Sequence, residues 1–306
     1  MTNDPHAFAI HHADLSTGVR LAYIHEGIGG VPLVLLHGYP ETKRIWWRNI
    51  AALAAAGFEV VVPDLRGYGD SSLAPDGFYD PAAYARDVYA LVHDALGHES
   101  VTMAAGDVGG VVMLDMDERY PGFVRRQVFF NSVPPVLPEI YEAAGLPVSL
   151  LSDTHPTGDY RVKQGRDGDA LAAELNTPVL RRQWVAGMYG PRLWASPGGF
   201  SADDIDFHTE PFGDADKLRA SWGPYELAYG KPMSEMAMMF SVVSVPTLVL
   251  YGMDDQVVPD VFAAQCEYAF SRLTGPFLVP RTGHFLQCER ADLFNRALAE
   301  YLLPRA

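Results

Sequence analysis

Short apolar runs alternate with amphipathic segments in the amino-terminal part of the chain. The runs at residues 31–36, 58–62 and 127–131 are largely apolar, which is typical of strands buried on both faces of a sheet. Apolar residues at helical spacing follow Asp80-Pro81, a pair typical of a helix start, and Gly97 ends that segment. Because strands alternate with helices, the pattern predicts a parallel, doubly wound sheet.

A hairpin is predicted at the amino-terminal edge of this sheet. Residues 7–12 and 19–25 are strand-like and flank a Ser16-Thr17-Gly18 turn. The alternation resumes late in the chain, with strands at 247–251 and 277–280 before a final helix. The predicted fold class is therefore α/β, with a mostly parallel sheet and antiparallel strands at one edge.

The segment from residue 133 to about 240 lacks this alternation. It is rich in Pro, Gly, Tyr and Trp, which is typical of short helices and loops. A stretch of about a hundred residues is too long for a loop within a compact fold. Ligands of open α/β sheets bind at the carboxyl edge of the strands. We therefore predict a first part of the core at 1–132, an inserted helical cap over that edge at 133–240, and the rest of the core at 241–306.

The stretch at 101–110 places an aspartate between an apolar strand and an apolar helix. Its centre, Ala105-Gly106-Asp107-Val108-Gly109, has the small-x-nucleophile-x-Gly form of a nucleophile elbow. A serine at such a turn attacks carbonyl carbon, whereas a carboxylate attacks saturated carbon and forms an ester with it. Asp107 therefore points to opening of a strained or activated C–O or C–halogen bond. The alternative is an ordinary acid at a helix N-terminus.

Two later loops supply partners for Asp107. Asp255 and His284 each follow a predicted strand, so they are expected at the same carboxyl edge as the elbow. His284 is the candidate base that activates water for ester hydrolysis, and Asp255 would orient the imidazole. Asp254 is the rival for that second role. Backbone N–H groups of Tyr39 and Val108 are the candidate oxyanion donors.

Composition narrows the function classes. The 306 residues are 48% hydrophobic, with a formal net charge of −15 and no Lys/Arg-rich stretch, which argues against nucleic acid as a partner. The start of the chain lacks a signal peptide pattern, and no apolar run is long enough for a membrane span. Two cysteines indicate a reduced, cytoplasmic protein with free thiols, the alternative being a Cys266–Cys288 bridge. His11-His12 has no third ligand in sight, so neither metal nor cofactor is expected.

With these residues in place, the chain resembles the α/β-hydrolase-fold epoxide hydrolases over nearly its whole length. The resemblance rests on five stretches, namely His37-Gly38-Tyr39-Pro40, the polar loop at 64–71, the Asp107 elbow, residues 252–259 and Gly283-His284. It implies a core of the α/β-hydrolase fold, with a nucleophile, an acid and a histidine in that order, and hydrolysis of an epoxide to a vicinal diol. The implied partner is a small apolar epoxide. The sequence leaves the oligomeric state open, with a homodimer as one alternative.

In this family two cap tyrosines hydrogen-bond the epoxide oxygen and protonate it as the ring opens. The resemblance assigns these roles to Tyr160 and Tyr225. A phenol suits the task because it is a good donor that stays neutral at pH 7. The alternative is packing in the cap, as expected for its other tyrosines, Tyr141, Tyr189 and Tyr229.

The chain departs from the family pattern at three positions. Gly106 stands where a histidine is usual, Val108 where a tryptophan is frequent, and Glu226 where an arginine commonly follows the second tyrosine. These departures bear on the shape of the pocket and the class of substrate. The reaction itself is unaffected, because the residues with chemical roles are kept.

Two other readings remain open. Haloalkane or haloacid dehalogenases use the same aspartate. They bind the halide with a tryptophan, or the substrate carboxylate with an arginine, directly after the nucleophile, and Val108 offers neither donor. A non-catalytic small-molecule binding protein of the same fold would have lost a member of the Asp107, Asp255 and His284 set, and this chain keeps all three. An epoxide hydrolase is therefore the preferred hypothesis.

Overall fold

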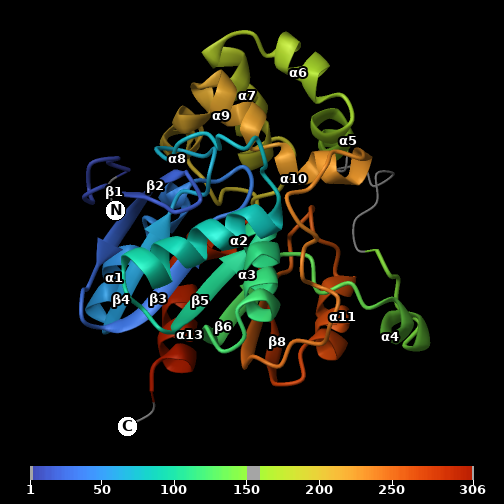
Figure 1. Ribbon diagram of the computed structural model, residues 1–306. Helices are drawn as coiled ribbons and strands as arrows, with labels where there is room; N and C mark the ends of the chain where they lie inside the picture. Colours follow the sequence, from blue (N-terminus) through green and yellow to red (C-terminus); the bar gives the residue numbers. More distant parts are fainter. Residues whose placement is uncertain (1–2, 150–158, 305–306) are drawn as a thin grey trace.

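A computed structural model describes residues 3–149 and 159–304, and it shows a central sheet with helices on both faces (Figure 1). In the described residues the sheet has eight strands, in the order β1-β2-β4-β3-β5-β6-β7-β8. Their bounds are β1 (His11–Asp14), β2 (Arg20–Glu26), β3 (Val31–Leu36), β4 (Phe58–Pro63), β5 (Val101–Gly106), β6 (Val124–Phe130), β7 (Thr247–Gly252) and β8 (Leu273–Val279). The predicted α/β class is confirmed.

The antiparallel strands lie at one edge of the sheet, as predicted. β2 is antiparallel to both β1 and β4, whereas all the pairs from β4 through β8 are parallel. The hairpin of β1 and β2 is confirmed, but its first strand begins at His11 instead of residue 7. The Phe8 ring packs against Trp47 with centroids 5.1 Å apart, so this segment turns away from the sheet.

Helices of the core cover both faces of the sheet. They are η1 (Lys43–Trp46), α1 (Ile50–Ala55), α2 (Pro81–Tyr89), η2 (Ala90–Ala95), α3 (Asp107–Arg119), α11 (Val261–Ala269), α12 (Leu286–Glu289) and α13 (Ala291–Leu302). α2 and α3 pack together on one face, and α1 and α13 on the other (Figure 1). Asp80 caps α2 by accepting a hydrogen bond from the N–H of Ala83 at 2.9 Å. The predicted final helix is broken at Arg290, whose backbone leaves the helical conformation.

The middle of the chain is helical where it is described. Its elements are α4 (Pro138–Ala143), α5 (Asp159–Gly165), α6 (Gly168–Glu174), α7 (Pro178–Tyr189), α8 (Ala202–Thr209), η3 (Glu210–Gly213), α9 (Ala215–Ala220), α10 (Gly223–Glu226) and η4 (Leu227–Tyr229). Helices α5 to α10 lie over one edge of the sheet, whereas α4 lies beside α11 (Figure 1). A capping box of Ser201 and Asp204 starts α8. The division at residues 133 and 240 stays a prediction.

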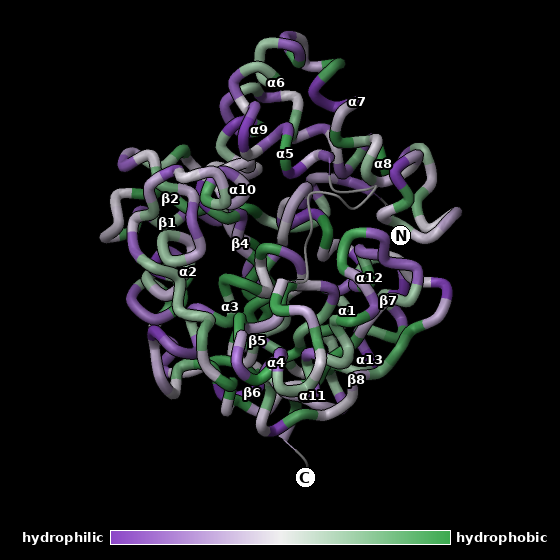
Figure 2. The backbone as a smooth tube through the Cα atoms, turned by 90° about the vertical axis from the view of Figure 1, so that its right-hand side faces the viewer, coloured by the Kyte–Doolittle hydropathy of each residue, from purple (hydrophilic) through white to green (hydrophobic). Residues whose placement is uncertain are grey.

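Apolar residues gather in the body of the molecule, around β5 and α3, while hydrophilic residues are frequent in α6, α7 and α9 (Figure 2). Strands β4, β5 and β7 are buried along their whole length. Cys266 and Cys288 are buried free thiols, so the alternative disulfide is not formed. In the described part of the chain, no helix combines the length and the apolar character that crossing a membrane requires.

Candidate active site

Asp107 lies where β5 meets α3, at the sharp turn that the sequence predicts. Its φ of +46° falls in the left-handed region, which is strained for a residue with a side chain and recurs at functional sites. The flanking glycines allow close approach of neighbouring segments. A Cβ on Gly106 would lie 2.5 Å from the Phe130 ring, and one on Gly109 would lie 2.6 Å from the carbonyl oxygen of His37. Gly106 is therefore required by the packing of this chain, which leaves no space for a histidine there.

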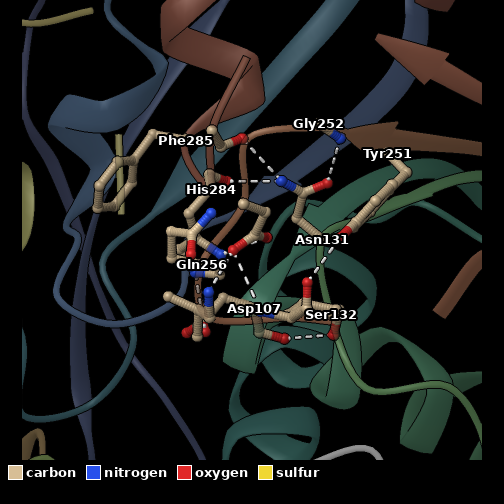
Figure 3. A network of polar contacts seen from close by, with 12 residues as sticks. Asp107, Asn131, Ser132, Tyr251, Gly252, Gln256, His284 and Phe285 are labelled. Atoms are coloured by element: carbon tan, nitrogen blue, oxygen red, sulfur yellow. Dashed lines mark hydrogen bonds and ion pairs between the residues drawn. The ribbon is translucent and has the colours of Figure 1, made fainter. Parts of the chain in front are cut away.

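The structure brings the three predicted polar residues together at the carboxyl edge of the sheet; Figure 3 shows Asp107 and His284 side by side there. Nε2 of His284 lies 3.2 Å from Oδ2 of Asp107, and Nδ1 of His284 lies 2.9 Å from Oδ2 of Asp255. The side chains of His284 and Asp255 are 1% and 0% exposed, and that of Asp107 is 13% exposed. The arrangement joins one imidazole to two carboxylates, of which only Asp107 remains open to a ligand.

The neighbouring carboxylates of Asp254 and Asp255 have different partners. Oδ1 of Asp255 accepts hydrogen bonds from the backbone N–H groups of Val257 and Val258, at 2.7 and 3.1 Å. Asp254 instead accepts a hydrogen bond from the Ser196 hydroxyl at 2.7 Å. The geometry therefore favours Asp255 as the partner of His284.

Charge around His284 favours its protonated form. Burial alone would lower the pKa of the imidazole, but the charge of Asp255 and hydrogen bonds to Asp107 and Asp255 outweigh it and raise the pKa well above its usual value. Any reaction that neutralises Asp107 removes one of the negative charges that raise the pKa of His284. The pKa of His284 must then fall, which would make the imidazole available as a base.

One of the two candidate oxyanion donors contacts Asp107 directly. The backbone N–H of Tyr39, just after β3, donates to Oδ1 of Asp107 at 2.7 Å. Val108 is the second residue of α3, and an N–H in the first turn of a helix has no acceptor within that helix. The N–H groups of Tyr39 and Val108 therefore stay candidate oxyanion donors to Oδ1 of Asp107.

The two predicted cap tyrosines line one cavity with Asp107. This cavity has a volume of about 350 Å³, and its lining also includes Val108, Arg161 and Val257. The rings of Tyr160 on α5 and Tyr225 on α10 are 5.4 Å apart at an interplanar angle of 80°. Burial is the main reason that the pKa of each phenol is raised, so both stay protonated at neutral pH. Tyr141 and Tyr189 are not among the lining residues, whereas Tyr229 is.

Comparison with known proteins agrees with this geometry. A family model described as the α/β hydrolase fold matches residues 31–291. This chain belongs to the α/β hydrolase fold family. It is 27% identical to the soluble epoxide hydrolase of Corynebacterium sp. (strain C12), over 96% of this chain and 97% of that protein. It is 24% identical to the non-heme haloperoxidase of Rhodococcus erythropolis, over 94% of this chain and 97% of that protein.

A solved structure of similar fold is that of the epoxide hydrolase CorEH without ligand. The two chains are 23% identical, and the match covers 96% of this chain and 98% of that one, with a TM-score of 0.79. At this identity the structural match shows that CorEH and the α/β hydrolase described here share a fold. The chemistry has to be argued from its own residues.

Two residues that the sequence pattern did not single out support the loops of Asp107 and His284. The amide Nδ2 of Asn131 donates to the carbonyl oxygen of Gly283 at 2.8 Å, and its Oδ1 accepts from the N–H of Gly252 at 2.9 Å (Figure 3). The hydroxyl of Ser132 donates to the backbone carbonyl of Asp107 at 2.6 Å. Asn131 and Ser132 directly follow β6, so the strand-end rule that selects Asp107 would also have selected them.

A second support missed in the sequence links the histidine loop to the segment of the predicted cap that carries Trp194. The backbone N–H of His284 donates to the carbonyl oxygen of Trp194 at 2.7 Å, and the Trp194 ring packs against both His284 and Tyr160. A Cβ on Gly283 would lie 2.3 Å from that carbonyl oxygen, so a glycine is needed for the close approach. No local sequence signal marks Trp194, because its partner is 90 residues away along the chain.

Glu41 is a buried carboxyl next to the site. Oε2 of Glu41 accepts the N–H of Gly38 at 2.6 Å, and Oε1 accepts from the Gln287 amide at 2.9 Å. Burial raises its pKa to about 7, with the charge of Asp107 acting in the same direction and the Gly38 hydrogen bond and the charge of His284 opposing it. Glu41 therefore titrates near neutral pH and holds the loop that carries the Tyr39 N–H.

Proposed function

We propose that this α/β hydrolase converts an epoxide and water to a vicinal diol through an ester on Asp107. The observation that carries the proposal is a carboxylate at the elbow, within 3.2 Å of His284 and in one cavity with two phenols, of which Tyr160 is buried and Tyr225 partly buried. A carboxylate nucleophile suits attack on saturated carbon, and phenols suit protonation of the oxygen that leaves. The relatives named as epoxide hydrolases support the same reaction.

In the first step Asp107 attacks one carbon of the epoxide. We assign Oδ2 as the attacking oxygen, because Oδ1 is engaged by the N–H of Tyr39. A new C–O bond forms as the C–O bond of the ring breaks, and the released oxygen takes a proton from Tyr160 or Tyr225. The product of this step is a hydroxyalkyl ester with no charge on Asp107.

In the second step water attacks the carbonyl carbon of the ester. His284 takes a proton from this water, and Asp255 stabilises the imidazolium that forms. The negative charge of the tetrahedral intermediate develops on Oδ1 of Asp107, where the N–H of Tyr39 is already in place. Collapse of the intermediate breaks the bond between this carbonyl carbon and the alkyl oxygen, and the imidazolium of His284 gives its proton to that oxygen as the diol leaves. The new carboxyl group on Asp107 returns its proton to the phenolate formed in the first step, so the aspartate, the histidine and the tyrosine are all restored.

The cavity suggests the class of epoxide. Its volume of about 350 Å³ and its mostly apolar lining suit a small hydrophobic substrate. Val108 and Val257 contribute apolar surface close to Asp107. A cytoplasmic location is a further proposal, which the two free cysteines support.

A single turnover in H₂¹⁸O tests the proposal directly. Enzyme in molar excess is mixed with a small aliphatic or aromatic epoxide in labelled water, and the diol and the protein are analysed by mass spectrometry. Because water attacks the carbonyl carbon of Asp107, the first diol should carry the original oxygen of the enzyme, and the label should appear in the peptide that holds Asp107. Label in the diol of the first turnover would contradict the ester mechanism. Absence of diol from every epoxide of the panel would contradict the reaction class.

A further inference from the structure

A second cluster of histidine and carboxylate side chains lies at the opposite edge of the sheet. Glu59 is the second residue of β4, and His98 comes three residues before β5, so both lie at the amino ends of parallel strands. His25 is near the end of β2, which runs antiparallel to β4. Asp107, by contrast, follows the carboxyl end of β5. The length of that strand, about 20 Å at roughly 3.3 Å per residue, separates the cluster from the cavity.

The three side chains converge on one carboxylate oxygen. Nε2 of His25 lies 2.7 Å from Oε1 of Glu59, and Nε2 of His98 lies 3.1 Å from the same oxygen. The second oxygen of Glu59 accepts the N–H of Gly29 at 2.9 Å. One ligand atom from each of the three residues lies within 4.8 Å of the others, and no other such group of three is found in the residues that the structure describes.

We propose that His25, Glu59 and His98 form a zinc site. Two imidazole nitrogens and one carboxylate oxygen are a donor set that suits Zn²⁺, with water as the fourth ligand of a tetrahedron. This site is independent of the proposed epoxide chemistry, because none of its residues lines the cavity of Asp107.

The ligand atoms would shift to accommodate the ion. Bonds of about 2.0–2.1 Å at tetrahedral angles place ligand atoms about 3.3 Å apart. The separations of 2.7 and 3.1 Å from Oε1 of Glu59 would therefore open, and the separation between the two imidazole ligand atoms, which is within 4.8 Å, would approach the same spacing. In exchange, each imidazole would give up the proton shared with that oxygen and coordinate through the lone pair of Nε2. The side chains are 8% to 17% exposed, which leaves a path for the ion to enter.

The charge of Glu59 favours a cation. An ionised carboxylate adds one negative charge to two neutral imidazoles, which are the forms in which these side chains bind a metal. Because the N–H of Gly29 holds the second oxygen, the first oxygen stays directed at both histidines, as the orientation of a ligating carboxylate requires.

The ion would join three segments of the chain through one centre. These are the end of β2 with the following turn, the start of β4, and the loop before β5. A metal that binds the folded chain and not the unfolded one stabilises the fold by mass action. The expected role is structural, at the edge of the sheet away from the cap.

The test measures zinc directly on tag-free protein that has been stripped with EDTA and dialysed. Calorimetric titration with ZnCl₂ and metal analysis after gel filtration should give one Zn²⁺ per chain. His25→Ala and His98→Ala should each weaken binding at least tenfold, and Glu59→Gln should weaken it as well. His11→Ala combined with His12→Ala is the matched control, because this exposed pair lies on the neighbouring strand without a third ligand; it should bind like the wild type.

A second measurement needs no variant of the site. Zn²⁺ should raise the melting temperature of the stripped wild-type protein, and Co²⁺ bound in its place should show the visible absorption of a four-coordinate site. Absence of zinc binding by the wild type at micromolar concentration would overturn the proposal. So would equal binding by the wild type and the His25 and His98 variants, or loss of binding in the His11/His12 control alone.

Discussion

The two edges of the sheet carry the same kinds of side chain in opposite proportion. At the carboxyl edge one imidazole, His284, lies between the carboxylates of Asp107 and Asp255. At the amino edge one carboxylate, Glu59, lies between the imidazoles of His25 and His98. Two carboxylates make the single imidazole a proton carrier, whereas two imidazoles and one carboxylate offer three lone pairs to a metal. The number of imidazoles relative to carboxylates, more than the presence of either group, determines what each cluster can do chemically.

Burial and backbone conformation separate the two clusters further. The His284 side chain is 1% exposed, while those of His25 and His98 are 14% and 17% exposed. Asp107 is held at a φ of +46°, and no residue of the amino-edge cluster has a positive φ. Strain and burial therefore accompany the site whose groups must change charge during a reaction, and the more open cluster is suited to holding an ion in one state.

The largest effect is expected from Asp107→Ala. This variant keeps the cavity but has no nucleophile, so diol formation and covalent labelling should both be abolished. Steady-state assay with an epoxide, together with circular dichroism to check the fold, measures this. Diol formation at the wild-type rate would contradict a catalytic role for the carboxyl edge, because the reaction would then not need the elbow carboxylate.

A matched pair of substitutions compares the two neighbouring acids. Asp255→Asn should reduce turnover by on the order of 10⁴-fold, as loss of the acid does in a Ser-His-Asp triad, because the imidazole loses its orientation and charge partner. Asp254→Asn, whose carboxylate bonds Ser196 instead, should leave turnover within a few-fold of the wild type. The ratio of the two kcat values is the measurement. Equal losses would assign the effect to folding of the loop.

The phenol proposal predicts a somewhat smaller effect on one step only. Tyr225→Phe should slow formation of the ester by about 10²-fold or more, because one proton donor to the epoxide oxygen is lost. Stopped-flow measurement of the alkylation step under single turnover separates it from hydrolysis. Tyr141→Phe is the control, because its hydroxyl donates to the carbonyl oxygen of Pro135 away from the cavity. An unchanged alkylation rate in Tyr225→Phe would make Tyr225 a packing residue.

A change in pH should have a modest effect on the rate of ester hydrolysis, the second of the two proposed steps. His284 has a raised pKa in the free enzyme, and it is the charge of Asp255 and the bonds to both aspartates that raise it. Esterification neutralises Asp107, so His284 should lose its proton at a lower pH in the ester than in the free enzyme. Hydrolysis of the ester should therefore slow as the pH falls through this lower value. The pH profile of hydrolysis, compared with NMR titration of His284, checks the sign; a higher apparent pKa in the ester would contradict it.

The smallest expected effect is that of metal removal on catalysis. EDTA should lower the melting temperature of zinc-loaded protein while leaving kcat/KM for the epoxide unchanged, because the proposed ion lies at the other edge of the sheet. Parallel assay and thermal denaturation of one sample measure both quantities. Loss of activity on chelation, restored by Zn²⁺, would show that the two clusters are not independent.

Much of this arrangement could be predicted from the sequence because strand ends are visible in it. Asp107, Asp255 and His284 each follow an apolar run, and parallel strands bring their carboxyl ends to one edge. The elbow was recognisable because its small residues are contiguous. Fold class and the approach of the three side chains thus followed from local pattern and order alone.

The features that escaped prediction depend on contacts between distant segments. Trp194 accepts a hydrogen bond from the His284 backbone, and Glu41 accepts one from Gln287 across 246 residues, without a local sequence signal at either end. The residues His25, Glu59 and His98 come from three segments far apart in the sequence, whereas His11-His12 is an adjacent pair that is visible in it. The expectation of no metal site was based on His11-His12 alone. It took no account of residues that the pairing of β2 with β4 brings together.

The most direct test of the central claim is the intact mass of His284→Gln after mixing with small epoxides and haloalkanes. Without its base the enzyme should attack but not hydrolyse, so the ester should accumulate. The account predicts an adduct equal in mass to the whole epoxide, mapped to Asp107 by peptide analysis. An adduct formed only from haloalkanes, with halide lost, would contradict it and make the protein a dehalogenase. An adduct on any residue other than Asp107 would contradict the assignment of the nucleophile.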